Sequence, residues 1–197
     1  ISFEATDDNH LEDYYVVEKG DYRLLKMATI IGANASGKSN MLQAYMFFLR
    51  LMRVPCENKT DKIVYDKFAL NADYAKRDTT FIINFIHREY HYNYRIVFNN
   101  DMVIEESLSR KSIKDGNMDK VFSRATNRET RLSTISLYGK YKIYSLDFDK
   151  VLINLLHNRT VLGAYLKSNV DIPVMKEIED WIISYPLPIV TTTEQGL

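Results

Sequence analysis

Residues 32–39 constrain the fold of this chain more than any other segment. They read Gly32-Ala-Asn-Ala-Ser-Gly37-Lys38-Ser39, which fits the pattern G-x-x-x-x-G-K-[ST] at every position. The apolar run Met27–Ile31 precedes the pattern, and the largely apolar segment Asn40–Arg53 follows it. A strand, a glycine-rich loop and a helix in this order are the context in which the pattern forms a phosphate-binding loop. We therefore predict a buried strand, then this loop, then a helix.

The residue types in the loop suit the binding of a nucleotide's phosphates. Gly32 and Gly37 allow a tight turn and a close approach of the backbone to a ligand. The amides of the loop and of the first helical turn then form a nest of donors for anionic oxygens, aided by the partial positive charge of the helix N-terminus. We expect ATP with Mg²⁺, with Lys38 as the catalytic residue at the β- and γ-phosphates and the Ser39 hydroxyl as the metal ligand. The predicted binding residues are Gly32, Ala33, Asn34, Ala35, Ser36, Gly37, Lys38, Ser39 and Asn40.

Length and composition exclude several classes of protein. The 197 residues fit one domain or slightly more. Basic and acidic residues number 26 each, so no global field favours nucleic acid or an anionic membrane. No apolar run reaches the roughly 18 residues of a membrane-spanning helix. The single cysteine, Cys56, cannot form an internal disulfide, which suits the cytoplasm.

Three blocks follow one another along the sequence. The first, residues 1–55, is expected to hold an opening strand at 1–5, a polar loop at 6–13, a short strand near Tyr14–Val17, and the phosphate-binding strand and helix. That helix is apolar on nearly every side, which is typical of a buried helix. Pro55 is expected to end it.

The second block, residues 78–125, is predicted to be an antiparallel β-lobe. Tyr90, Tyr92 and Tyr94 alternate with polar residues, which is the period of a strand with one buried face. The short turns favour hairpins. The predicted strands are 81–86, 90–98 and 102–108, joined by turns at 87–89 and 99–101.

The third block, residues 145–185, is predicted to be helical. Val174, Met175, Ile178, Trp181 and Ile182 form an amphipathic stripe, with Trp181 as a core anchor. Asp171 precedes the stripe as the expected N-cap. The chain starts inside a strand-like run and ends just after the apolar run 186–190, so we expect both ends to be cut inside a fold.

The two asparagines that flank the loop pattern, Asn34 and Asn40, narrow the type of loop. In the string Gly-Ala-Asn-Ala-Ser-Gly-Lys-Ser-Asn the segment resembles the ABC-type ATPase heads of the structural-maintenance-of-chromosomes and RecF group. From Leu24 to Ala44 it is most similar to bacterial AAA-labelled, ABC-like ATPases associated with abortive infection and other anti-phage systems. The resemblance continues more weakly through Tyr90–Tyr94, Glu105-Glu-Ser-Leu108 and the helix with Trp181.

The resemblance implies an α/β fold: a P-loop NTPase, ABC-ATPase-like head with an antiparallel β-lobe and a helical lobe. The whole chain would be the N-terminal portion of one such domain. Two heads would close around ATP as a homodimer, and Asn34 would reach the γ-phosphate region. Hydrolysis in such heads also needs a Walker B strand ending in Asp-Glu, a Ser-Gly signature motif and a switch histidine. None of these is found in the sequence, and Tyr144-Ser-Leu-Asp147 is too polar for a Walker B strand.

Several functions therefore stay open at this stage. The preferred expectation is ATP hydrolysis by the full-length protein, gating an anti-phage effector such as a nuclease. The alternatives are a RecF-like or SMC-like DNA repair or chromosome-maintenance ATPase, and a non-hydrolysing, ATP-gated dimerisation module. A GTPase is disfavoured, because Asn58-Lys-Thr-Asp61 follows the loop too closely to be a base-reading motif.

Other candidate features favour ordinary structural roles. The basic stretch 109–131 could contact DNA phosphates, but we interpret it as a solvated hairpin and loop. Glu105 and Glu106 are adjacent on a predicted strand, so they point to opposite faces and cannot share a site. The histidines show no metal-ligand spacing; they are His10, His87, His91 and His157.

Overall fold

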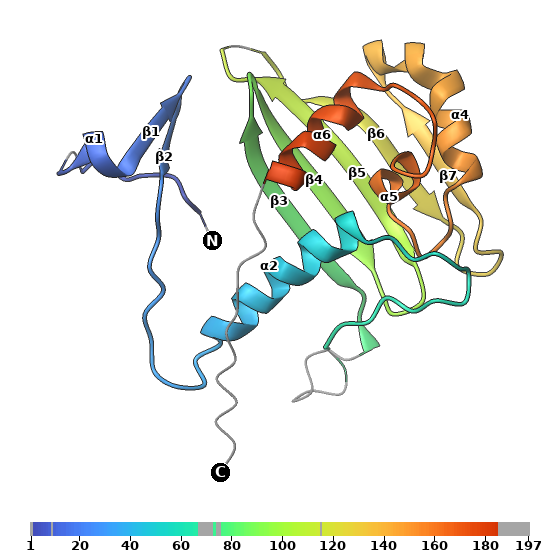
Figure 1. Ribbon diagram of the computed structural model, residues 1–197, viewed down its shortest axis with the longest axis horizontal. Coiled ribbons are helices and arrows are strands. Elements are labelled where there is room, and N and C mark those ends of the chain that lie inside the picture. Colours follow the sequence, from blue (N-terminus) through green and yellow to red (C-terminus); the bar gives the residue numbers. More distant parts are fainter. Residues whose placement is uncertain (1, 9, 67–72, 74–75, 115, 185–197) are drawn as a thin grey trace.

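The computed structural model describes residues 2–8, 10–66, 73, 76–114 and 116–184. The apolar run 186–190 lies outside these residues. The chain has a mixed α/β fold, dominated by one antiparallel sheet and the helices on one of its faces (Figure 1).

Five strands form the sheet as a simple meander, in which each strand pairs with the next along the chain. Three strands and both connecting turns follow the prediction: β4 alternates apolar and polar residues, and β3 and β5 lie on either side of it across short turns. The last two strands extend the sheet to Leu137, beyond the expected boundary at residue 125. The strands are β3 (Thr79–His87), β4 (Tyr90–Phe98), β5 (Val103–Ser112), β6 (Asp119–Thr126) and β7 (Ser133–Leu137).

Helices α2, α4, α5 and α6 lie on the same face of the sheet (Figure 1). They share one hydrophobic core with the strands, so the three sequence blocks pack together. Tyr92 and Tyr94 are buried in this core, as the period of two predicts. Trp181 is confirmed as a core anchor, since its ring stacks on Phe85 with centroids 3.6 Å apart. The helical segments are α2 (Lys38–Arg53), η1 (Gly139–Tyr144), α4 (Ser145–Ile153), α5 (Val161–Tyr165) and α6 (Pro173–Ser184).

Helix α2 begins at Lys38 and ends at Arg53, two residues before Pro55. The expected burial holds for its second half, where Phe48 and Leu49 are fully buried against the sheet. Its first half extends beyond the sheet (Figure 1), and Leu42 is 44% exposed. The helix therefore holds the loop at its N-terminus away from the core while its C-terminal half anchors it.

The N-terminal residues form a small separate unit. Helix α1 (Glu12–Tyr15) leads into a two-stranded hairpin of β1 (Val16–Lys19) and β2 (Tyr22–Leu25). The strand expected near residues 14–17 therefore begins only at Val16. The expected opening strand is reduced to a bridge between Glu4 and Leu24. The hairpin contacts the sheet where the Tyr22 hydroxyl lies 3.0 Å from His91 Nδ1.

The strand predicted over residues 27–31 does not form. The segment is extended without strand pairing and all five residues are exposed, with Ile31 at 89%. A strand needs a neighbouring strand for its backbone hydrogen bonds. Within the described part of the chain, no strand pairs with this segment. An apolar run alone was therefore not sufficient to predict a strand at residues 27–31.

The helical block is present, but one boundary was predicted wrongly. Helix α6 begins at Pro173, so the residue before the helix is Ile172 and not Asp171. Ile172 O accepts the bond from Lys176 N at 3.0 Å. Proline is favoured at the first helical position, because its missing N–H would have no partner there. None of the described helices is long and apolar enough to cross a bilayer.

Candidate functional site

The loop over residues 32–39 has the backbone geometry that its glycines permit. Gly37 has φ +89°, and Ala35 also lies in the left-handed region at φ +63°. A Cβ at Gly32 would lie 2.8 Å from Ser36 Oγ, so the serine hydroxyl would have to rotate away. The loop is thus a tight turn that depends on glycine at 37 for its conformation, while Gly32 packs closely against Ser36.

Among the residues that the structure describes, none accepts a hydrogen bond from the first amides of α2. Gly37 occupies the N-cap position and offers no side chain to accept a bond, and the first turn contains no acidic residue. Most helices place Ser, Thr, Asp or Asn at this position and acids in the first turn. Here the first residue is Lys38, a cation. The amides of Lys38, Ser39 and Asn40 are therefore left for an external acceptor, and the helix dipole favours an anion.

Lys38 is folded over the loop that precedes it. Its Nζ donates to Gly32 O at 2.7 Å and to Ala33 O at 2.6 Å, and lies 3.4 Å from Ser36 Oγ. The ammonium group is thereby placed at the centre of the turn, on the same side as the loop carbonyls. It supplies a full positive charge next to the uncapped helix end.

The structure brings all nine predicted binding residues together in one exposed loop and helix end. Lys38 is half-buried and the other eight are exposed, so a ligand can reach them from solvent. Ser39 follows Lys38 in the first helical turn, and Asn40 follows Ser39. The segment that precedes this loop in the sequence, residues 27–31, is not a strand. The loop therefore supplies backbone N–H donors, the Lys38 cation and the Ser39 hydroxyl, but it contains no carboxylate or histidine that could act as a general base.

A buried ion pair lies in the sheet, far along the chain from the loop. Arg124 Nη1 lies 3.4 Å from Glu106 Oε2, and both side chains are fully buried. Glu106 also accepts from Tyr94 Oη at 2.6 Å and from Val161 N at 2.9 Å. Burial raises the pKa of the Glu106 carboxyl, although its neighbours favour the charged form.

Arg124 corrects the interpretation of the basic stretch 109–131. It was expected to be solvated, yet it donates to the carbonyl oxygens of Leu156, His157 and Arg159 at 2.9–3.2 Å. Its side chain points inward from β6 and meets the loop between α4 and α5. The alternation of β6 is broken by the basic Arg124 at an inward position and by a register shift against β5 between Lys120 and Phe122. These two irregularities explain why no strand was predicted there.

A half-buried basic residue in this stretch, Arg110, is also paired. Arg110 donates to Glu177 Oε2 at 2.7 Å and to Tyr141 Oη at 2.9 Å. Arg128 remains exposed and forms an ion pair with Asp78 at 2.5 Å. The stretch is therefore not a uniform basic surface, and Arg124 cannot contact a DNA phosphate.

The loop between α4 and α5 also holds the segment that follows α2. Arg159 donates from Nε to Cys56 O at 2.8 Å, and Asn158 Nδ2 donates to the carbonyl oxygens of Asn58 and Asp61 at 2.8 Å. These buried polar residues were not singled out from the sequence. The signal available was a polar run, His157-Asn-Arg-Thr160, between two apolar helical segments.

The remaining sequence interpretations concern carboxylates and histidines. Glu105 is exposed and Glu106 is buried, which confirms that they point to opposite faces. Tyr144–Asp147 lies in η1 and α4 and is not a strand. Among the described residues, no group of three or more His, Cys, Asp or Glu side chains is arranged to hold a metal ion.

Comparison with known proteins adds no relative. Scans against protein-family models, curated proteins and solved structures each gave no match.

Proposed function

We propose that this chain binds ATP with Mg²⁺ through residues Gly32–Asn40. The observation that carries the proposal is the uncapped N-terminus of α2, combined with a lysine folded over a glycine-dependent turn. An isolated helix end would bind any anion weakly. The full match to G-x-x-x-x-G-K-[ST] adds the lysine and the hydroxyl at the spacing that phosphates and magnesium require.

Each residue of the loop has a separate role in this proposal. The amides at the start of α2 donate to phosphate oxygens, and Lys38 moves from the loop carbonyls to the phosphates. Ser39 supplies the hydroxyl ligand of Mg²⁺, which would neutralise charge between the phosphates. Gly32 and Gly37 keep the donors free of side chains. Asn34 faces the γ-phosphate region by resemblance to ABC-type heads.

The wider function follows as part of the same proposal. The chain would be the N-terminal portion of an ABC-like ATPase head that acts as a homodimer in the cytoplasm. Hydrolysis would also need a Walker B strand ending in Asp-Glu, a Ser-Gly signature motif and a switch histidine, none of which is found in this sequence. The preferred role is a nucleotide-gated anti-phage effector. A RecF-like repair ATPase and a non-hydrolysing ATP-gated dimer remain the alternatives.

DNA binding through the basic stretch is the weaker candidate. Arg124 is buried, and Arg110 and Arg128 are already paired with carboxylates. No described feature favours DNA over a solvated surface at this place, so the proposal is restricted to the nucleotide.

Equilibrium binding of ATP with Mg²⁺ tests the proposal. Lys38→Ala should weaken binding at least tenfold, because it removes the cation at the centre of the loop. Lys26→Ala is the matched control, since Lys26 also donates to a backbone carbonyl, Asp13 O, at 3.3 Å but lies outside the loop. Equal affinity of the wild type and Lys38→Ala for ATP would remove the assignment. Ser39→Ala should reduce the dependence of affinity on Mg²⁺.

A further inference from the structure

Strand β7 is an edge of the sheet, because within the described residues it pairs with β6 and with no other strand. Every second residue of β7 forms backbone hydrogen bonds to β6. Tyr138 N, just after the strand, donates to Val121 O at 3.2 Å. In an antiparallel pair, residues that bond to the neighbour alternate with residues whose N–H and C=O point the other way. The N–H and C=O groups of Ser133, Ile135 and Leu137 therefore face the open edge.

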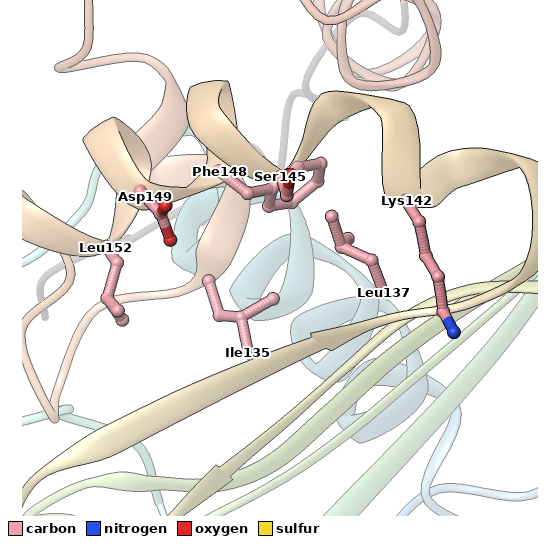
Figure 2. Close-up of a pocket in the computed structure, with 7 residues that line it drawn as sticks. All are labelled: Ile135, Leu137, Lys142, Ser145, Phe148, Asp149 and Leu152. Atoms are coloured by element: carbon pink, nitrogen blue, oxygen red, sulfur yellow. The ribbon is translucent and has the colours of Figure 1, made fainter.

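Two of these same residues line a groove between β7 and α4. Ile135 and Leu137 point from β7 toward the helix, and Phe148 and Leu152 point back from α4 (Figure 2). The groove has a volume of about 370 Å³. A strand added to the open edge would pair with Ile135 and Leu137. Its alternate side chains would then lie on the helix side of the sheet, in this groove.

The edge lacks the features that usually block such an addition. Natural edge strands are protected by lysine, proline or bulges. The sequence of β7, Ser-Thr-Ile-Ser-Leu, has no charge and no proline, and its pairing with β6 is regular. Large apolar side chains are also exposed nearby in the sequence: Ile143 in η1 and Leu146 and Ile153 in α4 are each 75–82% exposed. Exposed apolar surface can mark an interaction site.

Two charged residues at the rim of the groove indicate what would bind there. Lys142 lies at the Leu137 end, and Asp149 lies nearer Ile135 (Figure 2). In the described part of the chain neither side chain has an ion-pair partner. A strand antiparallel to β7 starts at the Leu137 end. Its N-terminal half would meet the cation, and its C-terminal half would meet the carboxylate.

We propose that β7 and the α4 groove form a docking site for an extended segment of a partner protein. The segment adds to the sheet as a sixth strand, antiparallel to β7. It carries an acidic residue near its start, apolar residues at alternate positions, and a basic residue near its end. The backbone bonds supply affinity and the groove supplies selectivity, as in other cases of strand addition.

Two capped synthetic peptides serve as probes: Glu-Thr-Val-Thr-Val-Thr-Lys, and the same peptide with its two charged residues exchanged. Hydrogen exchange followed by amide NMR should show that the first peptide protects the amides of Ile135 and Leu137. The amides of Thr134 and Ser136 already face β6 and should change little. The charge-exchanged peptide should bind at least threefold more weakly, since exposed charge pairs contribute modestly.

Charge-reversal variants make the test specific to the groove. Lys142→Glu combined with Asp149→Lys should invert the preference between the two peptides. The control combines Asp147→Lys with Lys150→Glu, which reverses a surface pair with a 3.3 Å contact on the same helix outside the groove. It should leave the preference unchanged.

Three results would overturn the proposal. One is the absence of protection at Ile135 and Leu137 at millimolar peptide. Another is equal affinity for both peptides in the wild type. The third is a wild-type dimer in solution that Ile143→Asp converts to a monomer, which would assign this face to a second copy of the chain.

Discussion

Arg124→Met should cost more stability than any other single change in the basic stretch. The substitution keeps the approximate length of the side chain but removes the charge that faces Glu106 at 3.4 Å. Breaking a buried ion pair from one side typically costs 3–5 kcal/mol, because the other charge stays buried without its partner. For a domain of this size, that loss corresponds to a fall in melting temperature on the order of 10 °C.

The expected loss of stability arises because Glu106 keeps a buried negative charge without a partner. A second substitution can test this cause. Glu106→Gln removes the negative charge and retains an oxygen that can accept the bond from Val161 N, now at 2.9 Å. The double variant should therefore be more stable than Arg124→Met alone. Arg128→Met is the matched control. Its ion pair with Asp78 is at the surface, where the expected loss is at most about 1 kcal/mol.

Thermal unfolding followed by circular dichroism measures all four proteins under one condition. If Arg124→Met melted within about 2 °C of the wild type, a loss well below 1.5 kcal/mol would follow. The buried pair would then not hold the sheet to the loop between α4 and α5, and the reasoning would fail.

The remaining predictions concern the core and one buried histidine. Trp181→Ala should destabilise the protein by about 3–5 kcal/mol, since the ring stacks on Phe85 in the core; a loss under 1 kcal/mol in chemical denaturation would contradict this packing. Gly163→Ala should destabilise by about 1–3 kcal/mol, because a Cβ there would lie 2.6 Å from Pro55 Cβ; a gain in stability, as for an ordinary helical glycine, would exclude that contact. Burial lowers the pKa of His157 in the folded protein, so stability should fall as pH drops below about 6.5, by at most about 1.4 kcal/mol per pH unit. His157→Gln should reduce this pH dependence of the melting temperature without abolishing it, because burial also lowers the pKa of His87 and of His91; an unchanged slope would assign the dependence to those residues.

The sequence predicted elements well where a local pattern determines them. Strand β4 alternates apolar and polar residues, β3 and β5 flank it across short turns, and α2 and α6 carry apolar residues at helical spacing. Local periodicity fails where one residue of the wrong type has a distant partner. Arg124 breaks the pattern of β6, and only the fold reveals that Glu106 and three carbonyl oxygens surround it.

The segment 27–31 shows the opposite error, a strand that the sequence predicts but that does not form. Its composition favours a strand, but a strand exists only beside another strand, and no local pattern supplies that neighbour. The candidate site could be predicted from the sequence, because its residues are contiguous. A loop and a helix N-terminus need only local geometry, so Gly32, Gly37, Lys38 and Ser39 come together without any long-range contact.

Amide NMR of the wild-type chain during a titration with ATP and Mg²⁺ locates the nucleotide directly. The shifts should concentrate in the amides of residues 33–40, in the loop and at the uncapped start of α2. The same titration of Lys38→Ala should leave these amides nearly unchanged. Shifts spread elsewhere, or equal shifts in both proteins, would contradict phosphate binding at this loop.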